Sequence, residues 1–157
     1  MLDYSSLNAD AQHALGQMYE QIGEEEKAVR YYLMAAKQNH CPALIDLAMA
    51  FGAGNGVEKD LYKAHRLFLK AANLGDHFAE FMVGQDLFYG NGVEANAEEA
   101  VKWYIQAAEA GEHHAQFEMG MIFEMGGNMQ FANDWYIKAA NQGNKDAIQK
   151  LQTRHSD

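Results

Sequence analysis

The fold of this chain is decided by residues 77–112, which read HFAEFMVGQDLFYGNGVEANAEEAVKWYIQAAEAGE. Residues 41–76 follow the same plan, as CPALIDLAMAFGAGNGVEKDLYKAHRLFLKAANLGD. Each stretch has a large apolar residue followed by a small one, then Gly-Asn-Gly-Val, then Ala-Ala and a closing glycine. The Ala-Ala pairs recur at spacings of 36, 36 and 32 residues, at Ala35-Ala36, Ala71-Ala72, Ala107-Ala108 and Ala139-Ala140. A helical sequence with a period in the thirties predicts a solenoid of helical hairpins.

Each unit is expected to contain two helices. In residues 41–76 apolar side chains fall at steps of three and four between about Pro42 and Phe51, which predicts a first helix. Glycines at 54 and 56 end it, and Asp60 is placed to cap a second helix that runs to about Asn73. In the next unit Asn96 is followed three residues later by Glu99, which predicts a capping box.

Every unit is expected to end with a residue in the left-handed backbone conformation. A residue that accepts positive φ follows each second helix, namely Asn39, Gly75, Gly111 and Gly143. We therefore predict an all-α fold, a right-handed α-solenoid of four helix-turn-helix hairpins with a C-terminal capping helix. We expect one repeat domain over residues 1–157, with units at about 8–40, 41–76, 77–112 and 113–144 and a capping helix at about 145–153.

These motifs resemble the Sel-one-like repeat family, a branch of the tetratricopeptide-like helical repeats. In residues 77–112 the resemblance rests on Val83-Gly84, Gly90-Asn91-Gly92-Val93, Glu99-Ala100-Val101-Lys102-Trp103-Tyr104, Ala107-Ala108 and Gly111. The first and fourth units lack Gly-x-Gly-Val and are four residues shorter. The resemblance implies an adaptor or scaffold that binds another protein, because that is how the family mainly serves.

Composition narrows the classes of function. The 157 residues are 48% hydrophobic, carry a net charge of −10 and contain a single cysteine, Cys41. An intrachain disulfide is thereby excluded, and no apolar run approaches the roughly 18 residues that span a bilayer. The first residues lack the apolar core of a signal peptide, so we expect a cytoplasmic protein, with an earlier removed leader left open.

The negative charge is concentrated in residues 77–112, which hold seven acids and one lysine. A field of this sign repels nucleic acid and anionic lipid, so neither is an expected partner. It would steer a basic protein, and the exposed acids that we expect to do so are Glu94, Glu98 and Glu99. The alternative reading is that the acids only keep the protein soluble.

The concave face of such a solenoid is the expected binding surface, because the first helix of each unit lines it. The inward positions hold His13, Gln17, Ile45, Met49, Phe81, Gln85, Phe88, Phe117, Met121 and Glu124. Methionine adapts its shape and is common on binding surfaces. Two interpretations of this apolar stripe remain open, a ligand groove and packing between repeats.

No constellation of catalytic or metal-binding residues is evident. His77 and His113 share a register, yet Cys41 and Lys145 hold that register elsewhere, so we predict no metal. Residues 52–57 lack the Gly-Lys-Ser/Thr of a phosphate loop. Cys41 has no orienting acid beside His40, so we expect no catalytic residue and no cofactor.

The sequence therefore predicts a non-catalytic protein–protein interaction module, of adaptor, scaffold or immunity type. One alternative is an enzyme that binds or hydrolyses β-lactams, as some cysteine-rich members of the family are described to do. This chain lacks their paired cysteines. Another alternative is a structural part of a larger assembly. The identity of the partner and the oligomeric state are not encoded in any motif.

Overall fold

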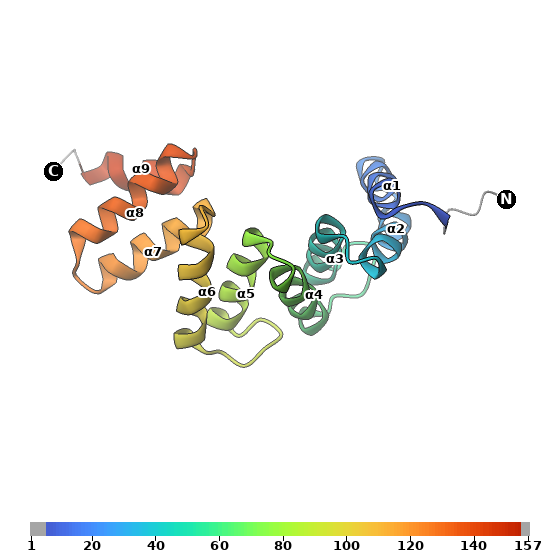
Figure 1. Cartoon of the computed structure of the whole chain (residues 1–157), viewed down its shortest axis with the longest axis horizontal. Coiled ribbons are helices and arrows are strands. Elements are labelled where there is room, and N and C mark those ends of the chain that lie inside the picture. The colour runs from blue at the N-terminus through green and yellow to red at the C-terminus, as the bar shows by residue number, and fades with distance from the viewer. Residues whose placement is uncertain (1–5, 155–157) are drawn as a thin grey trace.

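The computed structural model describes residues 6–154, which form nine α-helices and no strand. In Figure 1 the helices follow one another in a curved row, with the two ends of the chain at opposite ends of the row. The helices are α1 (Ala9–Gln21), α2 (Glu25–Lys37), α3 (Cys41–Ala53), α4 (Leu61–Asn73), α5 (His77–Tyr89), α6 (Ala97–Glu109), α7 (His113–Met125), α8 (Met129–Asn141) and α9 (Lys145–Arg154). The predicted all-α helical repeat is confirmed.

The helix caps follow the sequence signals, with one difference. The side chains of Asp60 and Asn96 accept hydrogen bonds from the backbone N–H of Lys63 and Glu99, at 3.0 and 3.1 Å. The predicted capping box does not close, because the backbone N–H of Asn96 donates to the carbonyl of Leu87 at 2.8 Å instead. The loop thus folds back onto the last turn of α5, where Glu99 cannot compete for the same N–H.

The core of each hairpin is an aromatic ring between small residues. Tyr104 is buried between α5 and α6, and a Cβ on Gly84 would lie only 2.8 Å from its ring. The first and fourth hairpins repeat this contact with Gly16 beneath Tyr32 and Gly120 beneath Tyr136. Small residues at these positions therefore set the distance between the two helices of a hairpin.

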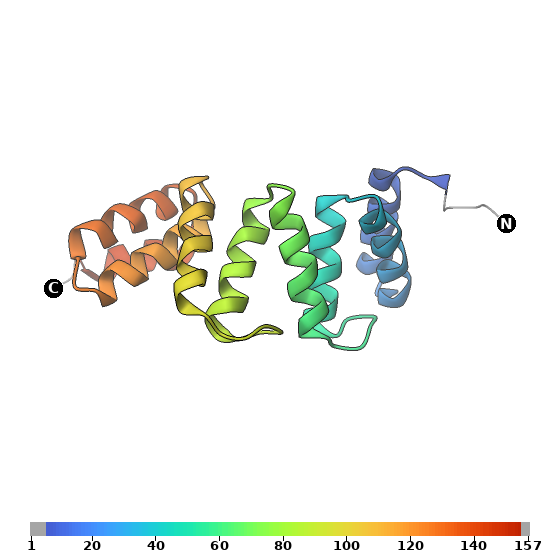
Figure 2. The ribbon, with the colours of Figure 1, turned by 60° about the horizontal axis from the view of Figure 1, so that its bottom comes forward.

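The loops of the two central hairpins reach back to the preceding hairpin, and both lie along one edge of the row (Figure 2). Gly56, with φ of 66°, packs on the first turn of α2, where a Cβ would lie 2.4 Å from the carbonyl oxygen of Glu25. Gly92, with φ of 70°, packs on α4 in the same way, 2.1 Å from the carbonyl oxygen of Leu61. Only glycine meets both demands, positive φ and contact with a backbone.

The odd-numbered helices α1, α3, α5, α7 and α9 present one face of the row, which we call the odd-helix face. Side chains link its neighbouring members, as when His13 of α1 bonds to Asp46 of α3 and Lys150 of α9 bonds to Glu124 of α7. This face corresponds to the surface that the sequence predicts to bind a partner. Within residues 6–154, no helix has the length and apolar character needed to span a membrane.

Candidate protein-binding face

The residues predicted to bind a partner lie on α1, α3, α5 and α7, but their exposure differs widely. Met49 is 50% exposed and Phe88 is 38% exposed, and Tyr89 beside it is 64% exposed. Gln17 is exposed, whereas the half-buried members are His13, Ile45, Gln85, Phe117, Met121 and Glu124. Of the apolar residues predicted to bind a partner, Met49 of α3 and Phe88 of α5 are therefore the exposed ones.

Phe81 differs from the expectation, because it is only 6% exposed. The imidazole of His114, from α7, stacks on its ring with the centroids 5.3 Å apart and the planes inclined by 21°. The ring of Tyr104 also lies beside it, with ring centroids 6.0 Å apart. Phe81 thus packs between hairpins and offers a partner little surface.

The N-terminal part of the odd-helix face carries polar side chains that form hydrogen bonds with one another. His13 Nε2 lies 2.7 Å from Asp46 Oδ2, which joins α1 to α3. His40 Nε2 lies 3.0 Å from Asp10 Oδ1, and the two imidazole rings are 4.8 Å apart. His13 therefore serves first as a link between the first two hairpins.

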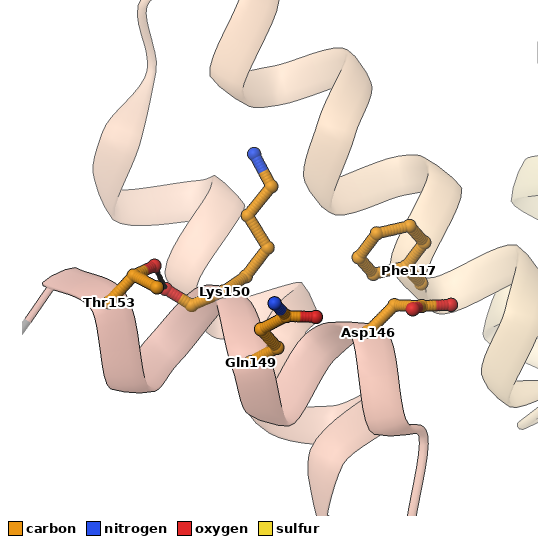
Figure 3. A pocket seen from close by; sticks show the side chains of 5 residues that line it. All are labelled: Phe117, Asp146, Gln149, Lys150 and Thr153. Atoms are coloured by element: carbon orange, nitrogen blue, oxygen red, sulfur yellow. Dashed lines mark hydrogen bonds between the residues drawn. The ribbon is translucent and has the colours of Figure 1, made fainter.

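The C-terminal end of the face holds a pocket of about 340 Å³ between α7 and α9 (Figure 3). It is lined by Phe117, Asp146, Gln149, Lys150 and Thr153. The Nζ of Lys150 is 3.0 Å from Glu124 Oε2, and the same carboxylate oxygen accepts a hydrogen bond from the hydroxyl of Tyr136. Glu124 is thereby held inside the structure rather than presented to a partner.

Sequence reasoning missed the contribution of α9, which it treated only as a cover for the last hairpin. The signal was present in the register. Asp146, Gln149 and Thr153 follow His114, Phe117 and Met121 by 32 residues, which is the length of the fourth unit. Because α9 continues the row as a first helix, its inward positions extend the odd-helix face.

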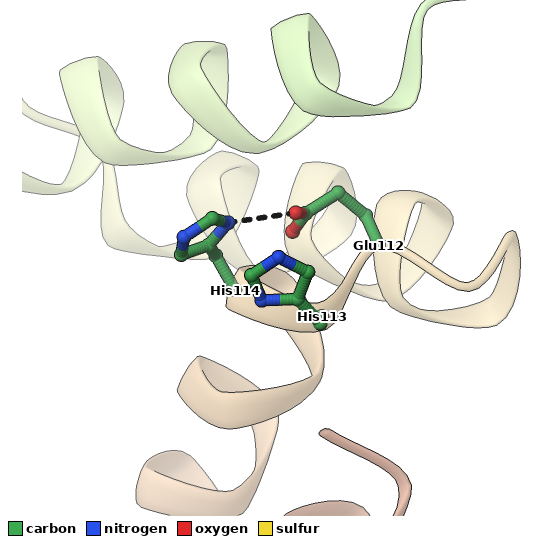
Figure 4. A group of neighbouring side chains, drawn as sticks. All are labelled: Glu112, His113 and His114. Atoms are coloured by element: carbon green, nitrogen blue, oxygen red, sulfur yellow. Dashed lines mark hydrogen bonds and ion pairs between the residues drawn. The ribbon is translucent and has the colours of Figure 1, made fainter. Parts of the chain in front are cut away.

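A cluster of metal-ligating side chains lies at the start of α7, where atoms of Glu112, His113 and His114 fall within 4.8 Å of one another (Figure 4). Structural contacts account for it. Glu112 caps the helix through Ala115 N and lies 2.8 Å from His114 Nδ1, while His113 Nδ1 lies 3.2 Å from the side-chain amide of Asn144. The ligand atoms of the cluster are thus already engaged within the protein, so we assign no metal to it.

His77 and His113, which share a register, each contact another residue. His77 Nδ1 lies 2.9 Å from Glu80 Oε2 on its own helix. Cys41 is half-buried, and burial, with a smaller contribution from Asp76, raises the pKa of its thiol. A raised pKa disfavours the thiolate, which is the nucleophilic form.

The acids expected to steer a partner lie along the edge formed by the hairpin turns. Glu94, Glu98 and Glu99 are all exposed, and Glu98 forms a helix-surface ion pair with Lys102 at 3.0 Å. A further acid, Glu118 of α7, is half-buried, and this burial raises its pKa, partly offset by His114. The edge is thus acidic, while the face beside it carries the apolar side chains.

Comparison with known proteins identifies the class of this fold. The Sel1 repeat model matches residues 9–40, 41–76, 77–112 and 113–144, so the chain belongs to the Sel1 repeat family. A search of curated protein sequences finds no match.

Solved structures show the same architecture. The protective antigen c5321 of uropathogenic Escherichia coli is 34% identical, with a TM-score of 0.86 over 95% of this chain and 34% of its own length. A Sel1 repeat protein of Oxalobacter formigenes is 29% identical, with a TM-score of 0.79 over 89% of this chain and 59% of its own. Cysteine-rich protein B of Helicobacter pylori is 25% identical, with a TM-score of 0.57 over 68% of this chain and 86% of its own. The chain spans about a third and about three fifths of the first two proteins.

Proposed function

We propose that this chain is a non-catalytic module that binds another protein through its odd-helix face. The observation that carries the proposal is the exposure of Met49, Phe88 and Tyr89 on the odd-numbered helices. The even-numbered helices also expose apolar side chains, among them Tyr62, Phe131 and Ile137. Met49 and Phe88 are preferred as anchors because they lie at the positions that the repeat register predicts to face a partner. Membership of a repeat family that commonly serves in protein interaction supports the same conclusion.

The charge of the chain favours a basic partner. The net charge is −10, and Glu94, Glu98 and Glu99 stand exposed along the edge of the hairpin turns. Acids at the rim of an interface act mainly on the rate of encounter, whereas buried apolar anchors act on the lifetime of the complex. The two sets of residues therefore have separable kinetic effects.

A hydrolytic role receives less support. The single thiol, Cys41, is half-buried with a raised pKa, and it has no partner cysteine in the chain. The lone cysteine is also compatible with a reducing compartment such as the cytoplasm. Adaptor, scaffold and immunity-type roles are all compatible with this surface, and the partner itself would distinguish them.

The test begins with capture of a partner from an extract by the tagged chain and its identification by mass spectrometry. Its affinity is then measured for the parent and for the double variant Met49→Ala with Phe88→Ala. We expect dissociation to accelerate by at least about tenfold, because each truncation removes an apolar anchor. Ile137→Ala, on the even-numbered helix α8, removes a comparable exposed side chain and should leave the affinity unchanged.

Salt dependence supplies a second readout on the same complex. Glu98→Gln with Glu99→Gln should slow association at low salt and have little effect at high salt, because screening shortens the reach of exposed charges. The proposed function is wrong if an identified partner binds the Met49 and Phe88 variant as tightly as it binds the parent.

A further inference from the structure

Phe81 and Phe117 hold the same place in successive hairpins, but their rings are covered differently. The imidazole of His114 stacks on Phe81, and its Nδ1 lies 2.8 Å from a carboxylate oxygen of Glu112. A planar nitrogen-containing group is thus held between a phenylalanine ring and a carboxylate. His114 thus shows that a planar nitrogen-containing group fits beside a phenylalanine ring at this position of the repeat.

At Phe117 the corresponding position of the next helix carries Asp146 in place of a histidine. One side of the Phe117 ring packs against Tyr136, with centroids 5.5 Å apart. Another side borders the open pocket of about 340 Å³, where Asp146 lies beside the ring (Figure 3). The ring and the carboxylate are therefore present, but the planar group between them is not supplied by the chain.

We propose that the pocket formed by Phe117 and Asp146 binds an arginine side chain of the protein partner. A guanidinium is planar, stacks on aromatic faces and forms two parallel hydrogen bonds to a carboxylate. It would take the space beside Phe117 that the ring of His114 takes beside Phe81. The carboxylate would come from Asp146, at the histidine's own position, because Asn144 stands at the position of Glu112. This inference rests on the proposed function, since it names the group through which a basic partner is recognised.

The remaining lining of the pocket suits such a cation. Lys150 is the one cation among the lining residues, and its Nζ is 3.0 Å from Glu124, which offsets its charge. The hydroxyl of Thr153 donates to the carbonyl of Lys150 at 3.0 Å, so its lone pairs remain able to accept. The side-chain oxygen of Gln149 adds a second neutral acceptor. Lysine fits less well, because an ammonium is a strongly hydrated point charge without a plane to stack.

The test uses the whole chain, labelled with ¹⁵N, and a blocked Gly-Arg-Gly peptide as the probe. We expect saturable shifts of amide resonances in α7 and α9. The matched probes are Gly-citrulline-Gly, which keeps the planar shape without the charge, and Gly-Lys-Gly, which keeps the charge without the plane. The citrulline peptide should bind at least about tenfold more weakly, the size of one lost charge-assisted contact. The lysine peptide should bind at least about threefold more weakly, because it keeps the charge but loses the stacking plane and the second parallel hydrogen bond.

Variants locate the site. Asp146→Asn should weaken binding of the arginine peptide by about tenfold, and Phe117→Leu by about threefold, because the first loses an ionic hydrogen bond and the second a stacking face. Asp134→Asn, an exposed acid on α8, removes the same formal charge elsewhere and should leave binding unchanged. The amide spectrum of each variant reports whether it is folded.

Three results would overturn the inference: equal binding of the citrulline or lysine peptide, unchanged binding by Asp146→Asn, or no saturable shift. None of them touches the proposed function, provided that partner binding still depends on Met49 and Phe88. Conversely, loss of that dependence would refute the proposed function even if the peptide binds to Phe117 and Asp146.

Discussion

The two central hairpins and the two terminal hairpins differ in how they hold their neighbours. The loops between the helices are seven residues long in the centre, at residues 54–60 and 90–96, and three residues long in the first and fourth hairpins. The long loops pack on the preceding hairpin through Gly56 and Gly92, whereas a Cβ on Gly23 or Gly127 would meet nothing within 4 Å. The four extra residues therefore serve to couple one repeat to the one before it.

The largest expected effect comes from the glycines of these loops. Gly56→Ala and Gly92→Ala should each lower the free energy of unfolding by about 2–4 kcal/mol, because the added carbon combines positive φ with overlap against a neighbouring backbone. Gly23→Ala and Gly127→Ala share the positive φ but have open space, and should cost about 1 kcal/mol. Chemical denaturation measures all four. Equal losses in both sets would show that the long loops do not couple the repeats.

A smaller difference is expected at the alanines between helices. Ala72→Leu and Ala108→Leu should each cost about 1–3 kcal/mol, because both positions are buried and have no room for three more carbons. The equivalent Ala140, in the fourth hairpin, is only half-buried, so Ala140→Leu should cost less. Thermal unfolding of the three variants tests this order. A cost at Ala140 that matches the others would contradict it.

The terminal hairpins have a hydrogen bond in place of the long loop. The hydroxyl of Tyr32 donates to Glu20 at 2.8 Å, and that of Tyr136 donates to Glu124 at 2.5 Å. In the third hairpin the ring of Tyr104 lies beside Phe88 instead of a glutamate. Tyr136→Phe should lower the free energy of unfolding by about 1–2 kcal/mol, since it removes a bond to a carboxylate. Tyr104→Phe is the matched control and should have a smaller effect in the same denaturation experiment.

The smallest effect concerns Glu118, on α7 of the fourth hairpin. Burial raises the pKa of its carboxyl, so the folded chain holds this proton more tightly than the unfolded chain does. The resulting contribution to stability is complete below the unfolded pKa and is lost as pH rises through the folded pKa. Glu118→Gln should therefore gain stability relative to the parent as pH rises above about 4, the range in which the unfolded carboxyl loses its proton. Parallel stability curves for the two proteins over this range would refute the assignment.

Sequence periodicity predicted the fold well, because helix caps and helix ends depend on residues that are close together in the sequence. Asp60 and Asn96 cap helices where expected, and Asn39 adopts a φ of 60° at the place where other units have glycine. The prediction of a capping box at Asn96 was wrong, and the reason lies outside the local sequence. Its N–H meets the carbonyl of Leu87 only once the loop has folded back.

The candidate site was less predictable, because exposure is decided across hairpins. Phe81 shares the inward register of Phe117, yet it is buried by His114, a residue 33 positions later. Likewise the pocket at Phe117 exists only because α9 continues the row and places Asp146 beside it. Register identifies which positions face the same side, but the identity of the residue in the next repeat decides which of them remain open.

The long loops also bear on the order in which the repeats can fold. Each one packs on a hairpin that precedes it in the chain, at Glu25 for the loop at Gly56 and at Leu61 for the loop at Gly92. During synthesis the N-terminal hairpin leaves the ribosome first. Every long loop therefore emerges when its docking surface on the preceding hairpin is already present. The chain is built so that assembly proceeds in the order of translation.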